Sequence, residues 1–205
     1  MEYGRIESEV LMKKHFKAIE LKYLDDDIIM KIREWRNQPF VRNKMYSQHD
    51  ITEEEHKKYI QALLNDENRG LFVFYLDDEP FGVFQYVLHK KDNCVECGNY
   101  LVDEEYQNLG YGTLMIFFQS EIIFNIFGCK KSCGEILECN KNIISMNKKM
   151  GAQLERIESK DKDGILYNVH CYSYLADNWI NYREKYEKIV YTLIDDFNLK
   201  KDVIY

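Results

Sequence analysis

A glycine-containing turn lies where a strand-like segment meets a long apolar segment. Residues 98–103 have the composition of a strand, and residues 113–127 are apolar enough for a buried helix. The turn between them has the sequence Gln107-Asn108-Leu109-Gly110-Tyr111-Gly112. The first amides of a helix have no partner within that helix, and glycine lets a ligand approach the backbone closely. The junction therefore predicts a site for a phosphate-bearing ligand.

The spacing of the two glycines excludes two common phosphate-binding loops. A Walker loop requires Gly-Lys followed by Ser or Thr, whereas Gly112 is followed by Thr113 and Leu114. A dinucleotide fingerprint requires three glycines, and this turn has two. The turn instead fits the pattern Gln/Arg-x-x-Gly-x-Gly/Ala, which needs support from the rest of the chain.

The order of the expected elements provides that support. Turn residues, capping residues and hydrophobic periodicity predict a strand, two helices, three strands, a helix, a strand, a helix and two strands, followed by a last helix. The expected strands cover residues 15–24, 71–76, 81–88, 95–102, 132–139, 153–158 and 166–175. The expected helices cover residues 28–36, 52–64, 113–127, 142–150 and 178–197.

The turn and this order together resemble the GNAT superfamily of acyl-CoA-dependent N-acyltransferases over about residues 15–175. The resemblance implies an α/β (α+β) GNAT fold, a mixed central sheet of about seven strands with splayed central strands and flanking helices. It implies one domain over residues 1–205, with a core over about 15–175 and a C-terminal helical extension over about 176–205. It also implies acetyl-CoA as the co-substrate. The cofactor-binding residues would be Leu101, Val102, Gln107, Asn108, Leu109, Gly110, Tyr111, Gly112, Thr113, Asn140 and Asn147.

A second part of the resemblance follows the strand over 132–139. Asn140, Met146 and Gly151 match a family pattern in which the Asn side chain contacts pantetheine. Taken alone, Asn140 has the simpler interpretation of a turn or cap residue. Many members carry a proton-donating Tyr four residues before this glycine, where this chain has Asn147. An amide can donate a hydrogen bond to sulfur but cannot supply a proton, so the general acid stays open.

The resemblance implies that an amine attacks the thioester, which requires a proton acceptor. His49, Glu96 and Tyr100 are the candidates, acting directly or through water. Strand alternation places Glu96, Gly98 and Tyr100 on one face, where a carboxylate and a phenol can line the same cleft. The structural alternatives are a cross-strand salt bridge for Glu96, a core position for Tyr100 and an exposed loop for His49.

The segment over residues 33–45 is the best indication of the acceptor. It carries four cations among aromatic and thioether side chains, in an otherwise acidic chain. Guanidinium groups suit a diphosphate, and we expect the aromatic and thioether surface to suit a uracil ring or a deoxysugar methyl group. The candidate substrate-binding residues are Trp35, Arg36, Asn37, Arg42 and Met45. Each of them has the alternative interpretation of a solvated helix face or a buried core position.

The motif Trp-Arg-Asn-x-Pro-x-Val-Arg-x-x-Met, followed by Ile51-Thr52 and Glu55-His56, resembles the N-acetyltransferases of pseudaminic acid biosynthesis. That resemblance implies a small-molecule substrate, a UDP-linked amino-dideoxy sugar whose 4-amino group is acetylated. The Trp-Arg-Asn core is shared with ribosomal-protein N-terminal acetyltransferases, so a protein N-terminus or a small amine remains the alternative acceptor. A non-catalytic acetyl-CoA-binding module is the alternative from another class.

Composition bounds the partners. A net charge of −7 argues against nucleic acid, which requires clustered cations. Neither a secretory signal nor an apolar run of membrane-spanning length is visible, so we expect a cytoplasmic enzyme without a membrane partner. The spacing of Cys94-x-x-Cys97 and Cys129-x-x-x-Cys133 is similar to that of a zinc site. However, the pairs lie on or beside expected strands and lack the turn-forming residues that usually separate zinc ligands, so we expect no metal. We expect the tyrosine-rich helix over 178–197 to cap the fold or to form a homodimer.

Overall fold

The computed structural model describes residues 13–162, 164–195 and 197–205, so residues 1–12 of the predicted domain lie outside the described part. One mixed sheet forms its centre, in the order β6-β7-β5-β4-β3-β2-β1-β8. The strands are β1 (Phe16–Glu20), β2 (Arg69–Leu76), β3 (Glu79–His89), β4 (Cys94–Leu101), β5 (Lys131–Leu137), β6 (Gln153–Lys162), β7 (Ile165–Leu175) and β8 (Val203–Ile204). The neighbours β4–β5 and β1–β8 run parallel, and the other neighbouring pairs run antiparallel.

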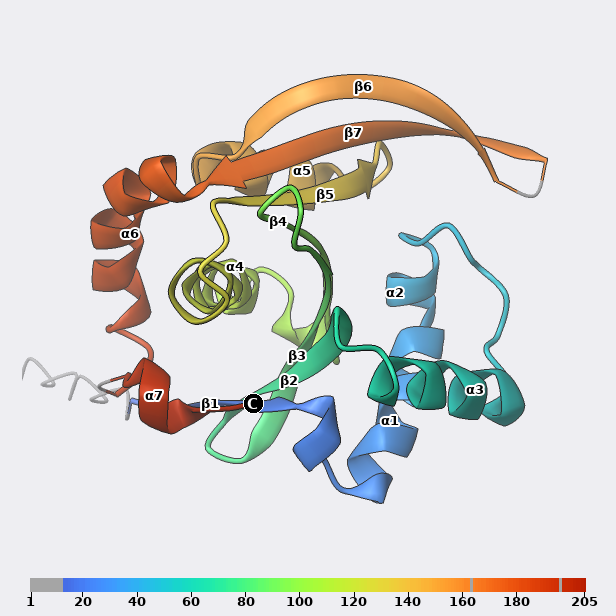
Figure 1. Ribbon diagram of the computed structural model, residues 1–205, viewed down its shortest axis with the longest axis horizontal. Helices are drawn as coiled ribbons and strands as arrows, with labels where there is room; N and C mark the ends of the chain where they lie inside the picture. Colours follow the sequence, from blue (N-terminus) through green and yellow to red (C-terminus); the bar gives the residue numbers. More distant parts are fainter. Residues whose placement is uncertain (1–12, 163, 196) are drawn as a thin grey trace, which may run out of the picture.

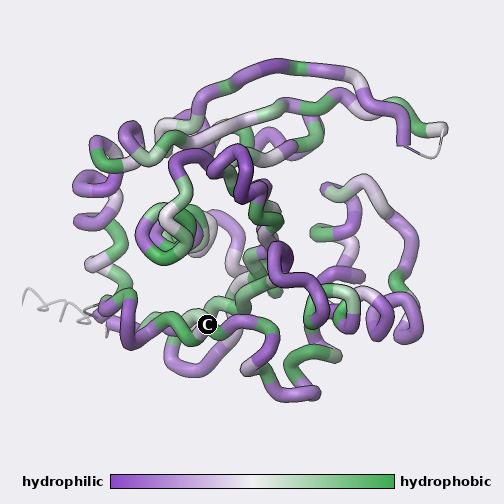
Figure 2. Tube along the Cα trace, viewed as in Figure 1, coloured by the Kyte–Doolittle hydropathy of each residue, from purple (hydrophilic) through white to green (hydrophobic). Residues whose placement is uncertain are grey.

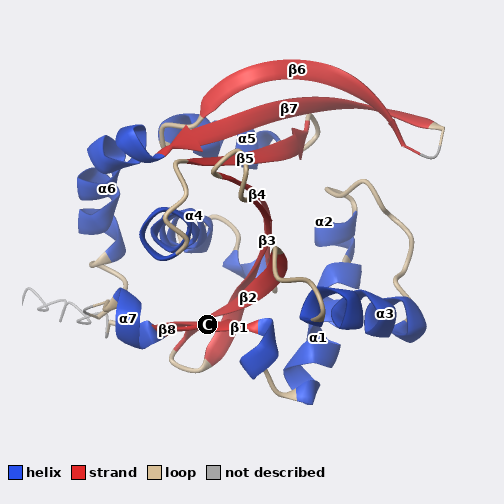
Figure 3. Cartoon of the chain, in the orientation of Figure 1, coloured by secondary structure: helices blue, strands red, loops and turns tan. Residues whose placement is uncertain are grey.

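Helices cover both faces of the sheet, with α4 on one side of strands β2–β4 and α1–α3 on the other (Figure 1, Figure 3). The helices are α1 (Asp26–Asn37), α2 (Pro39–Arg42), α3 (Glu53–Leu64), α4 (Tyr111–Glu121), α5 (Lys141–Lys149), α6 (Ala176–Val190) and α7 (Leu199–Asp202). A π-helical turn, Ile122–Ile126, continues α4, and short 3-10 helices cover Leu21–Tyr23 and Glu104–Tyr106. In the part of the chain that the structure describes, no helix combines the length and apolarity needed to cross a membrane.

Local sequence signals explain where several elements begin and end. The predicted capping box at α3 is confirmed, because the Glu55 amide donates to Thr52 Oγ1 at 3.2 Å and the Thr52 amide donates to Glu55 at 2.8 Å. The predicted β2–β3 hairpin is also confirmed. Its turn residues Asp77 and Asp78 have φ of 51° and 67°, the left-handed conformation that a two-residue hairpin turn requires.

The hydrophobic core has one part on each face of the sheet. α4 is buried on nearly all sides because it packs between the sheet and α6, and Phe117 and Phe118 are completely buried there. On the opposite face, Ile32 and Trp35 of α1 and Leu63 of α3 cover β2 and β3. The outer strand β6 contrasts with both parts, since its residues are mostly hydrophilic and exposed (Figure 2).

Strands β4 and β5 separate soon after they meet, as predicted for the two central strands. They pair at three positions, from Cys94 with Lys131 to Glu96 with Cys133, and the rest of β4 has no strand partner on that side among the described residues. Gly134 lies at the point of separation, where an added Cβ would meet the Cys97 carbonyl oxygen at 2.9 Å. The gap that opens beyond this point exposes the backbone edge of β4.

The C-terminal segment differs from the expected long helix over residues 178–197. α6 ends at Val190, and the chain then returns to the segment just before β1, where the Lys14 amide donates to Leu193 O and the Asp195 amide donates to Lys14 O. β8 adds a short strand beside β1, so the sheet has eight strands where about seven were predicted. The pattern of residues 178–197 did not indicate this return because tertiary pairing with β1 decides it.

Candidate functional site

The turn before α4 has the backbone geometry of an anion-binding site. Asn108 and Gly110 adopt left-handed conformations with φ of 62° and 93°, and Gly110 is the N-cap of α4. The amides of Asn108, Leu109 and Gly112 donate to no other group among the described residues. These free N–H groups lie at the positive end of the helix dipole, so the turn can bind a phosphate without side-chain charge.

A cavity of about 730 Å³ runs from this turn along the gap between β4 and β5; we call it the main cavity. The predicted site residues that line it are Met45, Tyr100, Leu101, Gln107, Asn108, Gly110, Gly112, Thr113, Asn140 and Asn147. Leu109 and Tyr111 belong to the turn but not to the wall. Leu109 is 63% exposed, and the Tyr111 ring stacks on Tyr106 with 4.5 Å between centroids. The volume is that of a site for an extended small molecule.

The edge of β4 offers backbone groups to this cavity. Alternate residues of a strand direct their amides to opposite edges, and the Val102 amide donates to Phe81 O on the β3 side at 3.1 Å. The Val102 carbonyl oxygen accepts from Gln38 Nε2 at 2.7 Å. Of the two residues predicted to contact pantetheine through the main chain, Leu101 therefore has its amide directed to the open edge, whereas the backbone of Val102 is already paired.

Asn140 and Asn147 reach the main cavity from opposite ends of α5. Asn140 is the N-cap of α5, yet its side chain makes no cap hydrogen bond and has no other hydrogen-bond partner among the described residues at the cavity wall. Asn147 is 7% exposed, and both ends of its amide are paired. Its Nδ2 donates to Ile143 O at 2.9 Å, and its Oδ1 accepts from the Tyr174 hydroxyl at 2.7 Å.

The three predicted proton acceptors lie apart. Tyr100 lines the main cavity, and its buried hydroxyl has no hydrogen-bond partner among the described residues. Burial raises the pKa of Tyr100, so the phenol stays protonated near neutral pH and acts as a donor. The Glu96 carboxylate lies outside the main cavity, 3.4 Å from His89 Nε2. His49 is 61% exposed, contacts Glu55, and lines neither the main cavity nor the smaller cavity beside α3.

This second cavity, of about 220 Å³, lies on the side of α3 and shares wall residues with the main cavity; we call it the side cavity. Glu96 lines the side cavity alone, whereas Gly98 and Glu135 line both. Glu135 was not among the residues selected from the sequence. It is the single acid of β5, the strand that neighbours the open edge of β4. This position in the sequence could have indicated a carboxylate near the predicted cofactor site.

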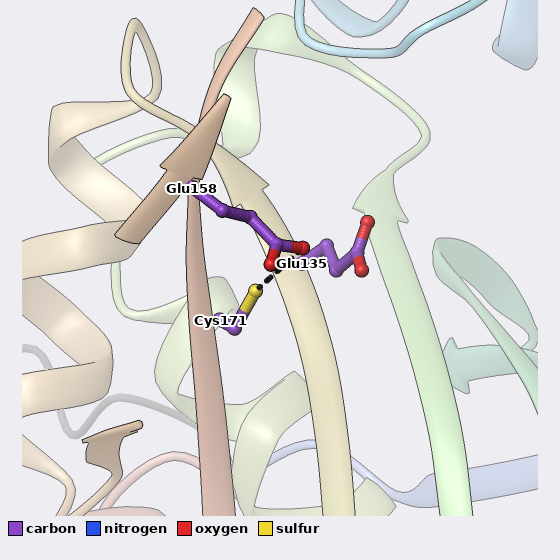
Figure 4. A group of neighbouring side chains, drawn as sticks. All are labelled: Glu135, Glu158 and Cys171. Atoms are coloured by element: carbon purple, nitrogen blue, oxygen red, sulfur yellow. Dashed lines mark hydrogen bonds between the residues drawn. The ribbon is translucent and has the colours of Figure 1, made fainter. Parts of the chain in front are cut away.

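Glu135 also belongs to a cluster on three neighbouring strands. Metal-ligating atoms of Glu135, Glu158 and Cys171 lie within 4.8 Å of one another (Figure 4). Lys160 pairs with both carboxylates, and Arg156 Nε contacts Glu158 at 2.8 Å. These cations already balance the carboxylates, so the cluster has the character of an ion-pair network. The absence of a metal stays a prediction.

The cysteines near the main cavity are thiols of low reactivity. Cys94 and Cys133 approach with 3.4 Å between their sulfur atoms, and Cys97 and Cys133 line the cavity. Burial raises the pKa of Cys97 and of Cys133 to about 12. Because the thiolate is the nucleophilic form, neither cysteine is prepared for covalent catalysis at neutral pH.

The cationic segment predicted to bind substrate holds a loop in place. Arg36 Nη2 donates to Ser47 O at 3.1 Å, and burial lowers the pKa of Arg36. Asn37 binds Ile51 twice, because its Nδ2 donates to the Ile51 carbonyl at 2.9 Å and its Oδ1 accepts from the Ile51 amide at 2.8 Å. These contacts fix the loop over residues 43–52.

The other three predicted substrate residues have different positions. Arg42, at the end of α2, pairs with Asp50 of this loop, and Trp35 of α1 is 9% exposed in the core between α1 and the sheet. Met45 lines the main cavity and is the member of the predicted set placed for direct contact with a ligand there. Substrate contact by the remaining members stays a prediction.

Comparison with known proteins agrees with this architecture. The profile of the Acetyltransferase (GNAT) family matches residues 29–152. Acetyltransferase PseH of Campylobacter jejuni is 32% identical over 81 residues, which cover 40% of this chain and 50% of the relative. The chain thus spans about half the length of that curated relative.

Solved structures share the fold at low sequence identity. Spermidine N-acetyltransferase from Vibrio cholerae, in complex with CoA and spermine, has a TM-score of 0.72 at 13% identity and covers 82% of this chain and 99% of its own. A putative acetyltransferase from T. thermophilus has a TM-score of 0.68 at 14% identity and covers 86% of this chain and 96% of its own. The splayed central strands, the amide-rich turn and the family match over residues 29–152 together show that the chain belongs to the GNAT acetyltransferase family.

Proposed function

We propose that the chain is an acetyl-CoA-dependent N-acetyltransferase that acetylates the 4-amino group of a UDP-linked amino-dideoxy sugar in pseudaminic acid biosynthesis. The observation that carries the proposal is the main cavity, which joins the free amides of the turn to the open edge of β4. The partial likeness to acetyltransferase PseH supports the sugar-nucleotide acceptor.

Acetyl-CoA would occupy the main cavity in an extended form. Its diphosphate would accept hydrogen bonds from the amides of Asn108, Leu109 and Gly112. Its pantetheine arm would pair with the open edge of β4 near Leu101, as an additional strand would. The free side-chain amide of Asn140 would contact the same arm from the start of α5.

The acceptor amine would approach from the side cavity. Glu135 lines both cavities, and we propose that its carboxylate, on leaving its ion pair with Lys160, is the proton acceptor, directly or through one water. The Tyr46 hydroxyl donates to the Glu135 carboxylate at 2.7 Å and orients it. Glu96 of the side cavity is the alternative acceptor among the residues predicted from the sequence.

Transfer would be direct, without an acyl-enzyme. The neutral amine forms a C–N bond to the thioester carbonyl carbon, and the intermediate then releases the sulfur with the electron pair of the C–S bond. The ammonium proton passes to the carboxylate or to water. A thiol has a pKa near 8.5, so the sulfur leaves as an anion with limited help from a donor. The raised pKa of Cys97 and Cys133 supports direct transfer over a cysteine nucleophile.

A thiol-release assay with a panel of amines tests the proposal. The panel contains a UDP-linked 4-amino sugar, an N-terminal peptide and spermidine, with acetyl-CoA in each reaction. We expect turnover with the sugar nucleotide and competitive inhibition by UDP. Turnover confined to the peptide or spermidine, with indifference to UDP, would contradict the proposed acceptor.

A small amine is the second candidate acceptor, and one observation favours it. Glu96 and Glu135 both line the side cavity, where two carboxylates suit a cationic amine better than a diphosphate. Arg69 is the cation on the same wall. Replacement of Arg69 with Ala distinguishes the two acceptors, because loss of this cation would weaken the binding of a sugar nucleotide and strengthen the binding of a polyamine.

A further inference from the structure

The main cavity and the side cavity share a short stretch of wall. The residues that line both cavities come from three neighbouring strands, and they are Gln85 of β3, Cys97 and Gly98 of β4 and Glu135 of β5. The two cavities therefore meet at this stretch, which we call the passage. With a thioester in the main cavity and an acceptor in the side cavity, the passage is where the amine can reach the reacting carbonyl.

Gly98 lies in the centre of the passage. It pairs directly with Gln85 in the register of β4 with β3. The register of β4 with β5 pairs Glu96 with Cys133, so two residues further along each strand Gly98 lies opposite Glu135 across the gap. Residues in such a row project from the same face of a sheet. Gly98 thus leaves open space between the side chains of Gln85 and Glu135.

The fold itself gives no reason for a glycine at this position. The φ of Gly98 lies outside the left-handed region, and an added Cβ would have no described atom within 4 Å. Other strand glycines differ, because a Cβ at Gly82 would meet Met115 at 2.5 Å and one at Gly134 would meet the Cys97 carbonyl at 2.9 Å. A glycine inside a strand weakens the strand, so Gly98 is more readily explained by the cavity than by the fold.

The open space beside Gly98 is on the acceptor side of the sheet. Strand alternation places Glu96, Gly98 and Tyr100 on one face. Glu96 lines the side cavity, and Tyr100 packs in the core beneath α1 and α3. The Cys97 side chain, in contrast, packs against the core on the α4 face. A side chain at residue 98 would therefore project toward the side cavity and narrow the passage.

We propose that Gly98 is a specificity-determining residue, whose missing side chain keeps the passage wide enough for an amine carried on a bulky acceptor. The inference rests on the proposed acetyl transfer and adds the route of the acceptor. The Gln85 side chain forms the opposite wall and makes no hydrogen bond among the described residues. A larger residue at position 98 narrows the route for the acceptor and leaves the turn that binds the diphosphate unchanged.

Residues of increasing size at position 98 test the passage. In thiol release with acetyl-CoA and a UDP-linked 4-amino sugar, kcat/KM for the sugar should fall roughly tenfold in Gly98→Ala and roughly a hundredfold in Gly98→Val. Calorimetric titration should show unchanged affinity for acetyl-CoA in both variants. Their melting temperatures should equal or exceed that of wild type, because a side chain with higher strand propensity enters open space.

A second substitution separates a blocked passage from a distorted β4. Gln85→Ala removes the opposite wall, and in the Gly98→Val background it should recover kcat/KM for the sugar roughly tenfold, because neighbouring side chains act non-additively. Val87→Ala is the matched control. Val87 lies on the same strand and face, pairs with Glu96 and lines the side cavity but not the main cavity, so its substitution should give no recovery.

Several results would overturn the inference. Undiminished turnover of the sugar nucleotide in Gly98→Val would show that the acceptor takes another route. A parallel loss of acetyl-CoA affinity, a lower melting temperature in Gly98→Ala, or equal recovery by Val87→Ala and Gln85→Ala would also contradict it. If Gly98→Val does not fold, Gly98→Ala decides with the same readouts.

The wild-type chain distinguishes failure of this inference from failure of the proposed function. If wild type acetylates spermidine and not the sugar nucleotide, the proposed acceptor is wrong, and the same variants are measured with spermidine, which must use the same passage. Unchanged kcat/KM for spermidine in Gly98→Val would then overturn the inference alone. A wild-type chain that acetylates no amine of the panel would sink the proposed function, and this inference with it.

Discussion

Gly110 combines a left-handed backbone with a position at the start of the phosphate-binding turn. Its φ of 93° costs any other residue about 1–2 kcal/mol. Gly110→Ala should therefore lower stability by about this amount and also weaken acetyl-CoA binding, because the turn must distort to relieve the strain. Urea unfolding and calorimetric titration measure the two effects.

Gly128 provides the control for this prediction. It also has a positive φ, 67°, with open space where a Cβ would be added, and it lies away from the main cavity. Gly128→Ala should cost similar stability and leave the affinity for acetyl-CoA unchanged. Equal affinity in Gly110→Ala and wild type would contradict the cofactor role of the turn.

The cavity-lining cysteines should be dispensable for chemistry. With a pKa of about 12, Cys97 and Cys133 carry almost no thiolate at neutral pH. Cys133→Ala and Cys97→Ala should each retain turnover within about threefold, because small changes of cavity shape are the main expected effect. Mass spectrometry of the enzyme with acetyl-CoA should show no acetylated cysteine. Abolished turnover together with an acetylated thiol would contradict direct transfer.

At the level of residues, the sequence indicated some site positions and not others. The turn was predictable because glycine at a strand–helix junction has few alternative explanations. The hydrogen-bond partners of Arg36 and Asn37 were not predictable, because a sequence shows a donor but not its acceptor. Here the acceptors are the carbonyl oxygens of Ser47 and Ile51. Glu135 was missed because its importance depends on the separation of two strands.

An ion pair between a buried carboxylate and a half-buried arginine ties α4 to α6. Glu121 is 2% exposed and accepts from Arg183 Nε at 2.9 Å and from Trp179 Nε1 at 3.0 Å. Arg183→Ala would leave the buried carboxylate short of its cation and should lower the free energy of unfolding by about 3 kcal/mol. Lys188→Ala, which removes an exposed pair with Glu184, should cost at most about 0.5 kcal/mol. Equal midpoints for the two variants in urea would contradict this role for Glu121.

Strand β6 should give the fold a dependence on acid. Hydrogen bonds from Arg156 and then from Lys160 lower the pKa of Glu158 from 4.5 to about 2. A carboxyl group with a lowered folded pKa stabilises the fold above its unfolded pKa, and this contribution is lost as the pH falls from about 4.5 toward 2. The melting temperature of Glu158→Gln should thus approach that of wild type as the pH falls through this range. A constant difference between pH 6 and 2.5 would contradict the assignment.

Elements with clear end signals were predicted well, and those set by long-range pairing were not. The capping box of α3 and the Asp77-Asp78 turn fixed their elements locally. α6 ended early and β8 appeared because the chain pairs with Lys14 and β1, which no local pattern of residues 178–205 indicates.

Over the whole molecule, the sheet separates the proposed binding of the cofactor on one face from the proposed binding of the acceptor on the other. The side of α4 and α5 contributes the turn to the main cavity, together with Asn140 and Asn147 from the two ends of α5, and the side of α1–α3 contributes the side cavity. The gap between β4 and β5 connects them, so an acyl group held from one side can meet an amine from the other. The order of elements predicted this architecture because local sequence signals specify each element. The width of the gap was not predictable, because it depends on the close approach of Gly134 in β5 to the Cys97 carbonyl in β4.

A crystal structure with acetyl-CoA tests the central claim most directly. We predict diphosphate oxygens within hydrogen-bond distance of the amides of Asn108, Leu109 or Gly112, and a pantetheine arm beside β4 beyond Glu96. Acetyl-CoA bound elsewhere, or a diphosphate held by lysine and arginine side chains away from the turn, would contradict the account.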